Sequence, residues 1–242
     1  MVLFQNVTKI YPPDRIVFRD VSISINRGDF ILLTGPAGSG KSVFFRLILC
    51  EEKPTRGKVV VFGRNTAELH SKEIPFLRRR IGFISQELKL MRPRTVHENL
   101  TAILHTTGIF GIQANQKAID MLNAVGLENM ESSYPSALSS SQQQKLMIAR
   151  ALVVQPTILL ADEPLSYLGE EDVQSIIKLI VGTKKQGTTI IWASHDNNTK
   201  LQTNQRIAEL KDGTIFVKEP TGTANLDSPK VDIAKGNPIN EN

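Results

Sequence analysis

One glycine-rich turn constrains the fold of this chain more than any other stretch of the sequence. Residues 35–42 read GPAGSGKS, which fits the pattern G-x-x-x-x-G-K-[ST], and they stand between an apolar run at 30–33 and a helical pattern at 43–48. Glycines in such a turn let successive backbone N–H groups converge on a polyphosphate, and the following helix adds the partial positive charge of its N-terminus. The sequence therefore predicts a strand, a phosphate-binding loop and a helix, in that order.

The side chains of this loop have separate tasks. The predicted loop consists of Gly35, Pro36, Ala37, Gly38, Ser39, Gly40, Lys41 and Ser42. In this pattern the lysine reaches the β- and γ-phosphates of a nucleotide, and the hydroxyl of the last residue ligates Mg²⁺. The alternative is a glycine-rich turn that binds nothing. We disfavour it, because the spacing, the flanking elements and the additional Gly38 all agree with phosphate binding.

Composition limits the class of protein. The chain has 242 residues, of which 40% are apolar, enough for one large domain or two small ones with a real core. Its one cysteine, Cys50, excludes a disulfide framework and favours a reducing compartment. No apolar run approaches the roughly 20 residues that span a bilayer, and the first residues lack the pattern of a signal peptide. We therefore expect a soluble, cytoplasmic chain, whose dispersed net charge of +5 indicates an anionic neighbour without identifying it.

Strand and helix patterns alternate along the chain. Strands are predicted at 3–7, 21–25, 30–33, 58–62, 81–85, 157–161 and 188–193, and helices at 96–105, 113–125, 142–154 and 172–185. In the last helix five apolar residues form one stripe that should face a sheet: Val173, Ile176, Ile177, Ile180 and Val181. This alternation predicts a mainly parallel α/β sheet with the phosphate site at the carboxyl ends of its strands.

The chain divides into a main domain at 1–218 and a tail. The two short strands at the start predict an antiparallel β edge, and the helices at about 87–140 predict an inserted helical lobe. Strands at 206–210 and 214–217 are joined by an Asp-Gly turn, which is a strong hairpin signal. Residues 219–242 contain three prolines among polar residues and few large apolar ones, so we expect this tail to be disordered.

Two acids follow the apolar strand at 157–161. Asp162 fits the Mg²⁺ partner of Ser42, and Glu163 fits the base that polarises water for attack on the γ-phosphate. A surface acid pair after a strand is common, but the phosphate loop upstream in the same chain makes this signal strong. The sequence therefore predicts that both acids face the nucleotide.

Two further polar residues end strands. The strand at 188–193 leads to His195 and Asp196, and the strand at 81–85 leads to Gln86, whose amide could contact Mg²⁺ and the attacking water. An isolated histidine is more often structural than catalytic, and a glutamine taken singly would indicate nothing. Their place at strand ends beside the predicted nucleotide site favours a functional role for both.

Taken in order, these motifs resemble the nucleotide-binding domain of ATP-binding-cassette proteins. The matching features are the phosphate loop, Gln86, a Leu138-Ser139 segment that opens a Gln-rich helix, Asp162-Glu163 and His195. The resemblance covers residues 2–218 and implies a P-loop NTPase fold with a mainly parallel core sheet, an antiparallel β edge and an inserted helical subdomain. It also implies that ATP and Mg²⁺ are bound.

The same resemblance implies roles for three residues. Tyr11 would stack on adenine, Gln86 would link the nucleotide to a membrane partner, and His195 would hold the γ-phosphate. An exposed aromatic in front of two prolines is the alternative interpretation of Tyr11.

One branch of the family matches best. Residues 73–82, with Gln86, Leu90-Met91 and 94–96, are similar to the branch that serves bacterial cell division. Members of this branch work with an integral membrane permease that controls cell-wall hydrolases. The resemblance implies two copies of the chain that sandwich two MgATP, held at the inner face of the cell membrane through the partner, with no nucleic acid bound.

The chain departs from the family at the signature segment, which is usually L-S-G-G-Q and here reads LSSSQ at 138–142. The resemblance implies that Ser139, Ser141 and Gln142 complete the ATP site of the opposite subunit. Serines add Cβ atoms where glycine allows close approach or a positive φ, at a cost of about 1 kcal/mol or more each if so. Against this, serine is a good helix N-cap and its hydroxyl can donate to phosphate. We expect weak or slow dimer closure.

Two more departures concern charge. Gly169 stands where the family has the aspartate of S-A-L-D, and Lys145 replaces an arginine and so loses a bidentate fork. Two functions therefore stay open: an ATPase, slow because its signature is degenerate, and an ATP-binding switch or scaffold with little hydrolysis.

Other readings of the sequence differ in what the chain acts on. The ATPase of a related exporter or lipoprotein-releasing system is a further alternative. A cassette acting on DNA or ribosomes is disfavoured, because the chain has a single cassette and no long coiled-coil insertion. Phosphoryl transfer to a small substrate would leave the signature-like helix unexplained.

Overall fold

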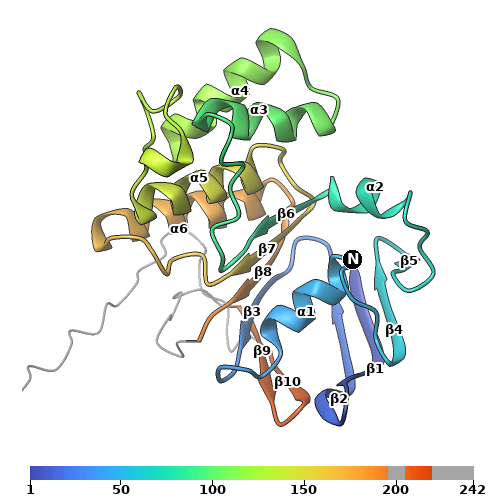
Figure 1. Ribbon diagram of the computed structural model, residues 1–242. Coiled ribbons are helices and arrows are strands. Elements are labelled where there is room, and N and C mark those ends of the chain that lie inside the picture. The colour runs from blue at the N-terminus through green and yellow to red at the C-terminus, as the bar shows by residue number, and fades with distance from the viewer. Residues whose placement is uncertain (196–204, 220–242) are drawn as a thin grey trace, which may run out of the picture.

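The computed structural model describes residues 1–195 and 205–219 and contains two sheets (Figure 1). The smaller sheet is antiparallel, in the order β2-β1-β4-β5, with β1 at Val2–Tyr11, β2 at Arg15–Ile25, β4 at Arg56–Val61 and β5 at Arg64–Asn65. The larger sheet has the order β10-β9-β3-β8-β7-β6. Its strands are β3 (Phe30–Thr34), β6 (Ile81–Ile84), β7 (Ile158–Asp162), β8 (Thr189–Ala193), β9 (Arg206–Lys211) and β10 (Thr214–Lys218).

Helices cover both faces of the larger sheet. They are α1 (Lys41–Ile48), α2 (Ile74–Arg78), α3 (Val96–Thr106), α4 (Gly111–Ala124), α5 (Ser140–Leu152) and α6 (Glu170–Lys185), with a 3-10 turn at Pro135–Ala137. Helix α1 lies between the two sheets, whereas α3 to α6 lie on the opposite side of the larger sheet (Figure 1). The fold is thus a layered α/β structure, as the alternation of patterns predicts.

Strand pairing confirms the mainly parallel core. Strands β9, β3, β8, β7 and β6 run parallel to their neighbours, and β10 pairs antiparallel with β9. The early strands differ from the expectation of a simple edge, because they form a sheet of their own with β4. Strands β1 and β2 are also longer than predicted, since their pairing continues through β-bulges as far as Tyr11 and Arg15.

Helix starts depend on local capping. At α5 the Ser139 hydroxyl accepts a hydrogen bond from the Gln142 amide, and the Gln142 side chain accepts one from the Ser139 amide. This capping box starts the helix at Ser140, two residues before the predicted position. Thr95 and Glu98 cap α3 in the same way. The short helix α2, which carries Pro75, is a feature that the sequence patterns did not indicate.

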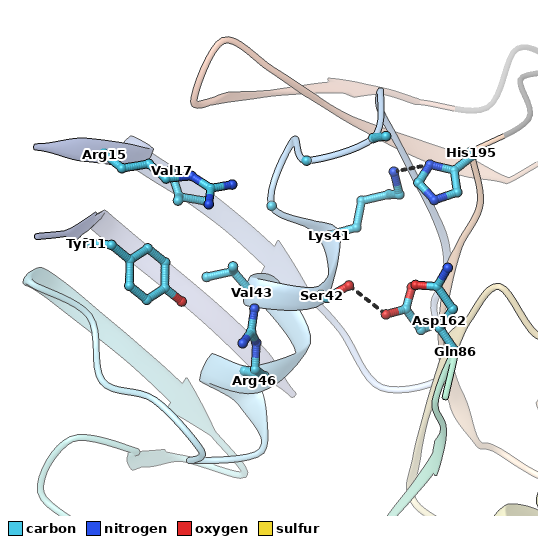
Figure 2. A pocket seen from close by; sticks show the side chains of 13 residues that line it. Tyr11, Arg15, Val17, Lys41, Ser42, Val43, Arg46, Gln86, Asp162 and His195 are labelled. Atoms are coloured by element: carbon cyan, nitrogen blue, oxygen red, sulfur yellow. Dashed lines mark hydrogen bonds between the residues drawn. The ribbon is translucent and has the colours of Figure 1, made fainter. Parts of the chain in front are cut away.

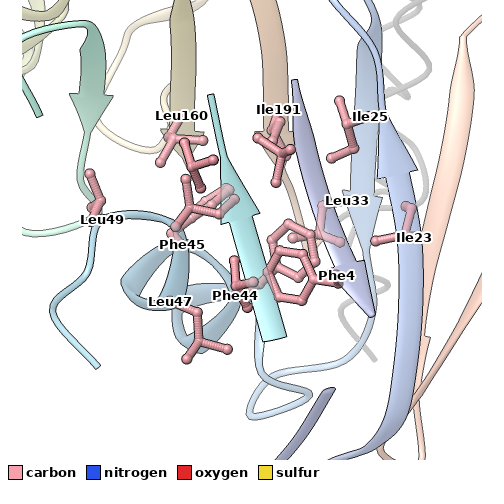
Figure 3. Close-up of a cluster of buried hydrophobic side chains, with 14 of the residues drawn as sticks. Phe4, Ile23, Ile25, Leu33, Phe44, Phe45, Leu47, Leu49, Leu160 and Ile191 are labelled. Atoms are coloured by element: carbon pink, nitrogen blue, oxygen red, sulfur yellow. The ribbon is translucent and has the colours of Figure 1, made fainter. Parts of the chain in front are cut away.

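Two apolar clusters hold the layers together. Between the sheets, the ring of Phe44 from α1 stacks on that of Phe4 from β1, with 4.1 Å between the ring centroids (Figure 3). On the other side of the larger sheet, Ile176, Ile177 and Ile180 of α6 are fully buried, which confirms the apolar stripe. Burial on both faces explains why the central strands read as continuous apolar runs.

The limits of the domains stay a prediction. Helices α3 and α4 fall inside the segment at 87–140 that we expect to be an inserted lobe. Asp196 and nearly all of the expected tail, from 220 onward, lie outside the described residues. No helix in the described part of the chain is long and apolar enough to cross a membrane.

We expect the Phe44→Ala variant to lose about 3–5 kcal/mol of unfolding free energy, because a fully buried aromatic ring leaves a cavity between the two sheets. Urea denaturation followed by circular dichroism measures this loss. The exposed Phe110 provides the control, since Phe110→Ala should change the free energy by less than about 1 kcal/mol. Equal losses in the two variants would contradict the assigned core.

Candidate functional site

The loop at 35–42 requires glycine at two positions. Gly35 has a φ of 142°, and a Cβ there would lie 2.3 Å from the carbonyl oxygen of Leu210. Gly40 has a φ of 105°, and a Cβ there would lie 2.7 Å from side-chain carbons of Val17 and Phe18. Contacts this short exclude any side chain, so the loop follows a path open to glycine alone. Helix α1 begins with the last two residues of the loop, at Lys41.

Lys41 is buried beneath the loop, with 4% of its surface exposed. Its Nζ donates to the carbonyl oxygens of Gly35 and Pro36, at 2.6 and 3.2 Å, and lies 2.9 Å from His195 Nδ1. Burial lowers the pKa of Lys41, and the charges of Glu163 and Asp162 oppose that change. The structure therefore brings together the lysine and the histidine that the sequence assigned to the phosphates.

The loop and strand β7 meet at a hydrogen bond. Ser42 Oγ donates to Asp162 Oδ2 over 2.8 Å (Figure 2). Burial raises the pKa of Asp162, although the bond from Ser42 and the charge of Lys41 act in the opposite direction. Two oxygen ligands of the kind that Mg²⁺ prefers thus lie side by side at the start of α1.

Glu163 lies next to Asp162 in an uncommon backbone conformation, with a φ of 49°. Its backbone amide donates to the carbonyl of Ala193 over 3.1 Å, which ties it to the end of β8. Its Oε1 is buried without a hydrogen-bond partner and lies 3.4 Å from His195 Nε2. Burial raises the pKa of this carboxyl more than the neighbouring His195 and Lys41 lower it.

A cavity of about 560 Å³ opens beside these groups (Figure 2). It is lined by Tyr11, Arg15, Val17, Ala37, Gly38, Gly40, Lys41, Ser42, Val43, Arg46, Gln86, Asp162 and His195. Among these described residues three are cationic, Arg15, Lys41 and Arg46, and only Asp162 is a carboxylate. A wall with this balance of charge suits a polyanion such as a nucleoside triphosphate.

Apart from the signature segment, four residues of the predicted site lie outside that wall. Pro36 and Ser39 line an adjoining cavity of about 430 Å³ on the other side of the loop, and the Ser39 hydroxyl is buried without a hydrogen-bond partner. Gly35 and Glu163 lie behind the wall, at the loop and at the end of β7.

The signature segment lies apart from this cavity, at the N-terminus of α5. Ser139 caps the helix, and Ser141 Oγ donates to Asp172 Oδ2 on α6 over 3.4 Å. The same carboxylate is 2.7 Å from Lys145 Nζ, so Lys145 keeps an ion pair although it lacks the fork of an arginine. Neither Ser140 nor Ser141 has a positive φ. Both serines belong to the first turn of a regular helix and carry no left-handed strain, so the cost that stays a prediction is the one for close approach.

Four lining residues were not predicted from the sequence: Arg15, Val17, Val43 and Arg46. Arg46 follows Ser42 by four residues on α1, and this helical spacing is the signal that would have placed it on the same face. Arg15 and Val17 come from β2, and only the packing of the antiparallel sheet against the loop brings them here.

The comparisons with known proteins agree with this geometry. Residues 18–166 match the family model described as ABC transporter, so the chain belongs to the ABC transporter family. Within it, the chain is similar to the cell-division ATP-binding protein FtsE. It is 36% identical to that of Mycobacterium tuberculosis, covering 94% of this chain and 99% of the relative. It is 35% identical to that of Escherichia coli K12, covering 89% and 97%.

A solved structure extends the likeness to three dimensions. An ATP-binding cassette in a dimeric post-hydrolysis state, bound to ADP and Pi, superposes with a TM-score of 0.85 at 33% identity, and the match covers 92% of this chain and 100% of that one. The P-loop ABC fold inferred from the motifs is thereby confirmed.

We expect Glu163→Gln to stabilise the nucleotide-free chain more at pH 8 than at pH 5. A carboxyl whose pKa is raised on folding contributes stability below its unfolded pKa and loses it as the pH rises through the folded pKa. The neutral amide escapes that loss, so the difference in melting temperature between variant and parent should grow with pH. Thermal scans with a metal chelator measure it. The exposed Glu128 gives a control variant, Glu128→Gln, for which a similar pH trend would contradict the assignment.

Proposed function

We propose that this chain binds MgATP in the cavity beside Lys41 and hydrolyses it as the ATP-binding subunit of a membrane complex. The observation that carries the proposal is the meeting of four groups from distant parts of the chain. Lys41 and Ser42 from the loop contact His195 and Asp162 from the ends of the parallel sheet. Cavities of roughly 300–1,000 Å³ are typical for small-molecule ligands, and this one falls within that range.

The groups around Lys41 support binding of a triphosphate. Lys41 Nζ donates to two carbonyl oxygens and lies close to a ring nitrogen of His195. A γ-phosphate offers charged acceptors instead, and hydrogen bonds between two charged groups are stronger than those to neutral acceptors. The loop amides add further donors on the same turn.

Ser42 and Asp162 fit the binding of Mg²⁺ together with the phosphates. In the described residues no group of three or more His, Cys, Asp and Glu side chains could hold a metal ion. Mg²⁺ suits such a site, because it takes one or two protein oxygens and completes its shell with water and substrate phosphates. When bound, the ion neutralises charge on the phosphate oxygens.

Glu163 and His195 support hydrolysis. The buried Oε1 of Glu163 lacks a hydrogen-bond partner, and a raised pKa brings a carboxylate closer to the neutral range in which a general base works best. Glu163 accepts a proton from a water molecule while the oxygen of that water bonds to the γ-phosphorus. The bond between the γ-phosphorus and the β–γ bridging oxygen breaks, which leaves ADP and phosphate. His195 contacts both Lys41 and Glu163 and so holds the lysine and the base at a fixed position relative to each other.

A second copy of the chain completes the site in this proposal. The N-terminus of α5, with Ser139, Ser141 and Gln142, lies away from the cavity of its own chain, and the partial positive charge of a helix N-terminus suits a phosphate. The solved relative is dimeric, which supports an ATP-dependent dimer in which this helix end faces the γ-phosphate of the partner copy. The extra Cβ atoms of Ser140 and Ser141 limit close approach and slow closure.

A groove of about 540 Å³ between α2, β6, α3 and α5 is the proposed docking site of the membrane partner. Its described lining contains the cations Arg78, Arg79, Lys89 and Arg150, and one acid, Glu51. Ser85 lines this groove, and the next residue, Gln86, lines the nucleotide cavity. Because the groove is basic, its proposed ligand is a cytoplasmic helix with acidic side chains. This helix would belong to an FtsX-like permease at the inner face of the cell membrane. The complex would regulate cell-wall hydrolysis in cell division.

A second function is favoured by one observation. Gly169 caps α6 without a side-chain hydrogen bond, so this position offers no carboxylate to couple two sites across a dimer. Together with the signature serines, this favours an ATP-binding switch or scaffold with little hydrolysis. The two functions differ in turnover and share the nucleotide site.

We expect Lys41→Ala to weaken MgATP binding at least tenfold, because hydrogen bonds to charged groups contribute about 1.5–3 kcal/mol. Glu163→Gln should bind MgATP like the parent and hydrolyse it about 10²–10⁴ times more slowly, since it lacks the general base. Calorimetry and phosphate release by the partner-bound protein measure the two effects. Tight MgATP binding by Lys41→Ala would overturn the assigned cavity. Equal turnover in the parent and Glu163→Gln would identify the switch.

We expect Arg79→Glu to reduce copurification with an FtsX-like permease several-fold, because it reverses a charge in the groove. Lys58→Glu makes the same change at an exposed site on β4, outside the groove, and should leave the yield unchanged. Detergent-solubilised membranes with tagged permease provide the measurement. Similar yields from both variants would place the permease elsewhere.

A further inference from the structure

One carboxylate behind the nucleotide cavity serves three other groups. The Tyr11 hydroxyl donates a hydrogen bond to Glu52 Oε2, and Lys9 Nζ lies 2.9 Å from the same oxygen. Arg46 Nη1 lies 3.2 Å from the other carboxylate oxygen, Glu52 Oε1. The side chains of Glu52 and Lys9 are only 17% and 12% exposed, so these contacts are partly shielded from water.

These contacts reach into the cavity from outside it. Tyr11 and Arg46 line the cavity, at the end away from His195, whereas Glu52 does not line it (Figure 2). Lys9 Nζ also lies 4.8 Å from the centroid of the Tyr11 ring. Glu52 therefore holds the ring and the guanidinium in place from behind.

The segment after α1 places Glu52 at this position. The backbone amides of Glu51 and Glu52 donate to the carbonyl of Arg46, at 2.9 and 3.3 Å, which turns the chain back along the helix. The amide of Thr55 donates to the carbonyl of Thr8 over 2.8 Å and fastens the segment to β1. The carboxylate thus joins α1, β1 and the segment that follows α1.

The electrostatics keep this carboxylate ionised. Burial alone raises the pKa of Glu52, but the hydrogen bonds from Lys9 and Tyr11 and the charges of Lys9 and Arg46 outweigh it, so the net pKa is lowered. Burial and the hydrogen bond to Glu52 raise the pKa of Tyr11 to about 12. The hydroxyl therefore stays a donor at neutral pH.

We propose that Glu52 is a positioning residue that fixes the Tyr11 ring and the Arg46 side chain at the nucleoside end of the cavity and thereby sets the affinity for the nucleoside part of the substrate. The inference rests on the proposed binding of MgATP. Glu52 does not reach the phosphate end, where Lys41, Ser42 and Asp162 act. A purely structural Glu52 would affect every ligand of the cavity equally.

Two ligands separate these roles: MgATP, and magnesium tripolyphosphate, which lacks the nucleoside. For Glu52→Gln we expect MgATP affinity to fall about tenfold while tripolyphosphate affinity stays within about twofold of the parent. The amide has no charge and one acceptor oxygen, which cannot serve three donors. The exposed Glu128 lines neither this cavity nor the proposed docking groove and gives the control, Glu128→Gln, which should bind both ligands like the parent. Titration calorimetry measures all affinities.

A double-mutant cycle tests whether Glu52 acts through the tyrosine hydroxyl. Tyr11→Phe keeps the ring and removes the hydroxyl, so adding Glu52→Gln to it should cost less MgATP affinity than Glu52→Gln costs alone. Should Glu52→Gln fail to fold, Tyr11→Phe by itself must weaken MgATP and spare tripolyphosphate.

The possible outcomes divide cleanly. Unchanged MgATP affinity in Glu52→Gln, or an equal loss for both ligands, overturns the inference and leaves the proposed function standing. A parent protein that binds neither ligand overturns both. Additive effects in the cycle overturn the route through the hydroxyl.

Discussion

The hydrogen bond between Ser42 and Asp162 joins residues 120 positions apart in the chain, and the candidate site depends on it. Parallel pairing of β3 with β8, and of β8 with β7, brings the carboxyl ends of these strands to one edge. The phosphate loop follows β3, and the acids end or follow β7. A parallel sheet gathers strand ends in this way, whereas an antiparallel sheet would alternate them. The topology therefore makes the chemistry possible before any side chain is specified.

The smaller sheet contributes the other half of the cavity. Val17 and Phe18 of β2 crowd Gly40 from one side, and Tyr11 of β1 stands at the far end of the cavity. The stacking of Phe4 on Phe44 holds this sheet against α1, so the position of the Tyr11 ring depends on the packing of the core. Glu52 adds a polar link between the same two elements. A single packed interface thus sets the distance between the proposed nucleoside end of the cavity and its proposed phosphate end.

Sequence patterns predict the features that depend on interactions between residues close together in the chain. The loop at 35–42, the apolar strands and the stripe on α6 follow from glycine placement and periodicity, and the structure contains all three. Arg15 and Glu52 could not be found this way, because their places depend on contacts between segments far apart in sequence. The start of α5 was missed by two residues, although Ser139 and Gln142 spell a capping box. The separate antiparallel sheet could not be predicted, because an alternating pattern indicates a strand but does not indicate which other strand it pairs with.

His195 couples the two halves of the phosphate end. Its Nδ1 lies 2.9 Å from Lys41 Nζ and its Nε2 lies 3.4 Å from Glu163 Oε1, so one ring spans the cation that would hold the phosphate and the acid that would activate water. Three segments far apart in the chain, namely the loop at 35–42 and the residues that follow β7 and β8, therefore meet at one side chain. The charge of Lys41 acts on both acids across this contact, because it lowers the pKa of Asp162 and of Glu163 against the effect of burial.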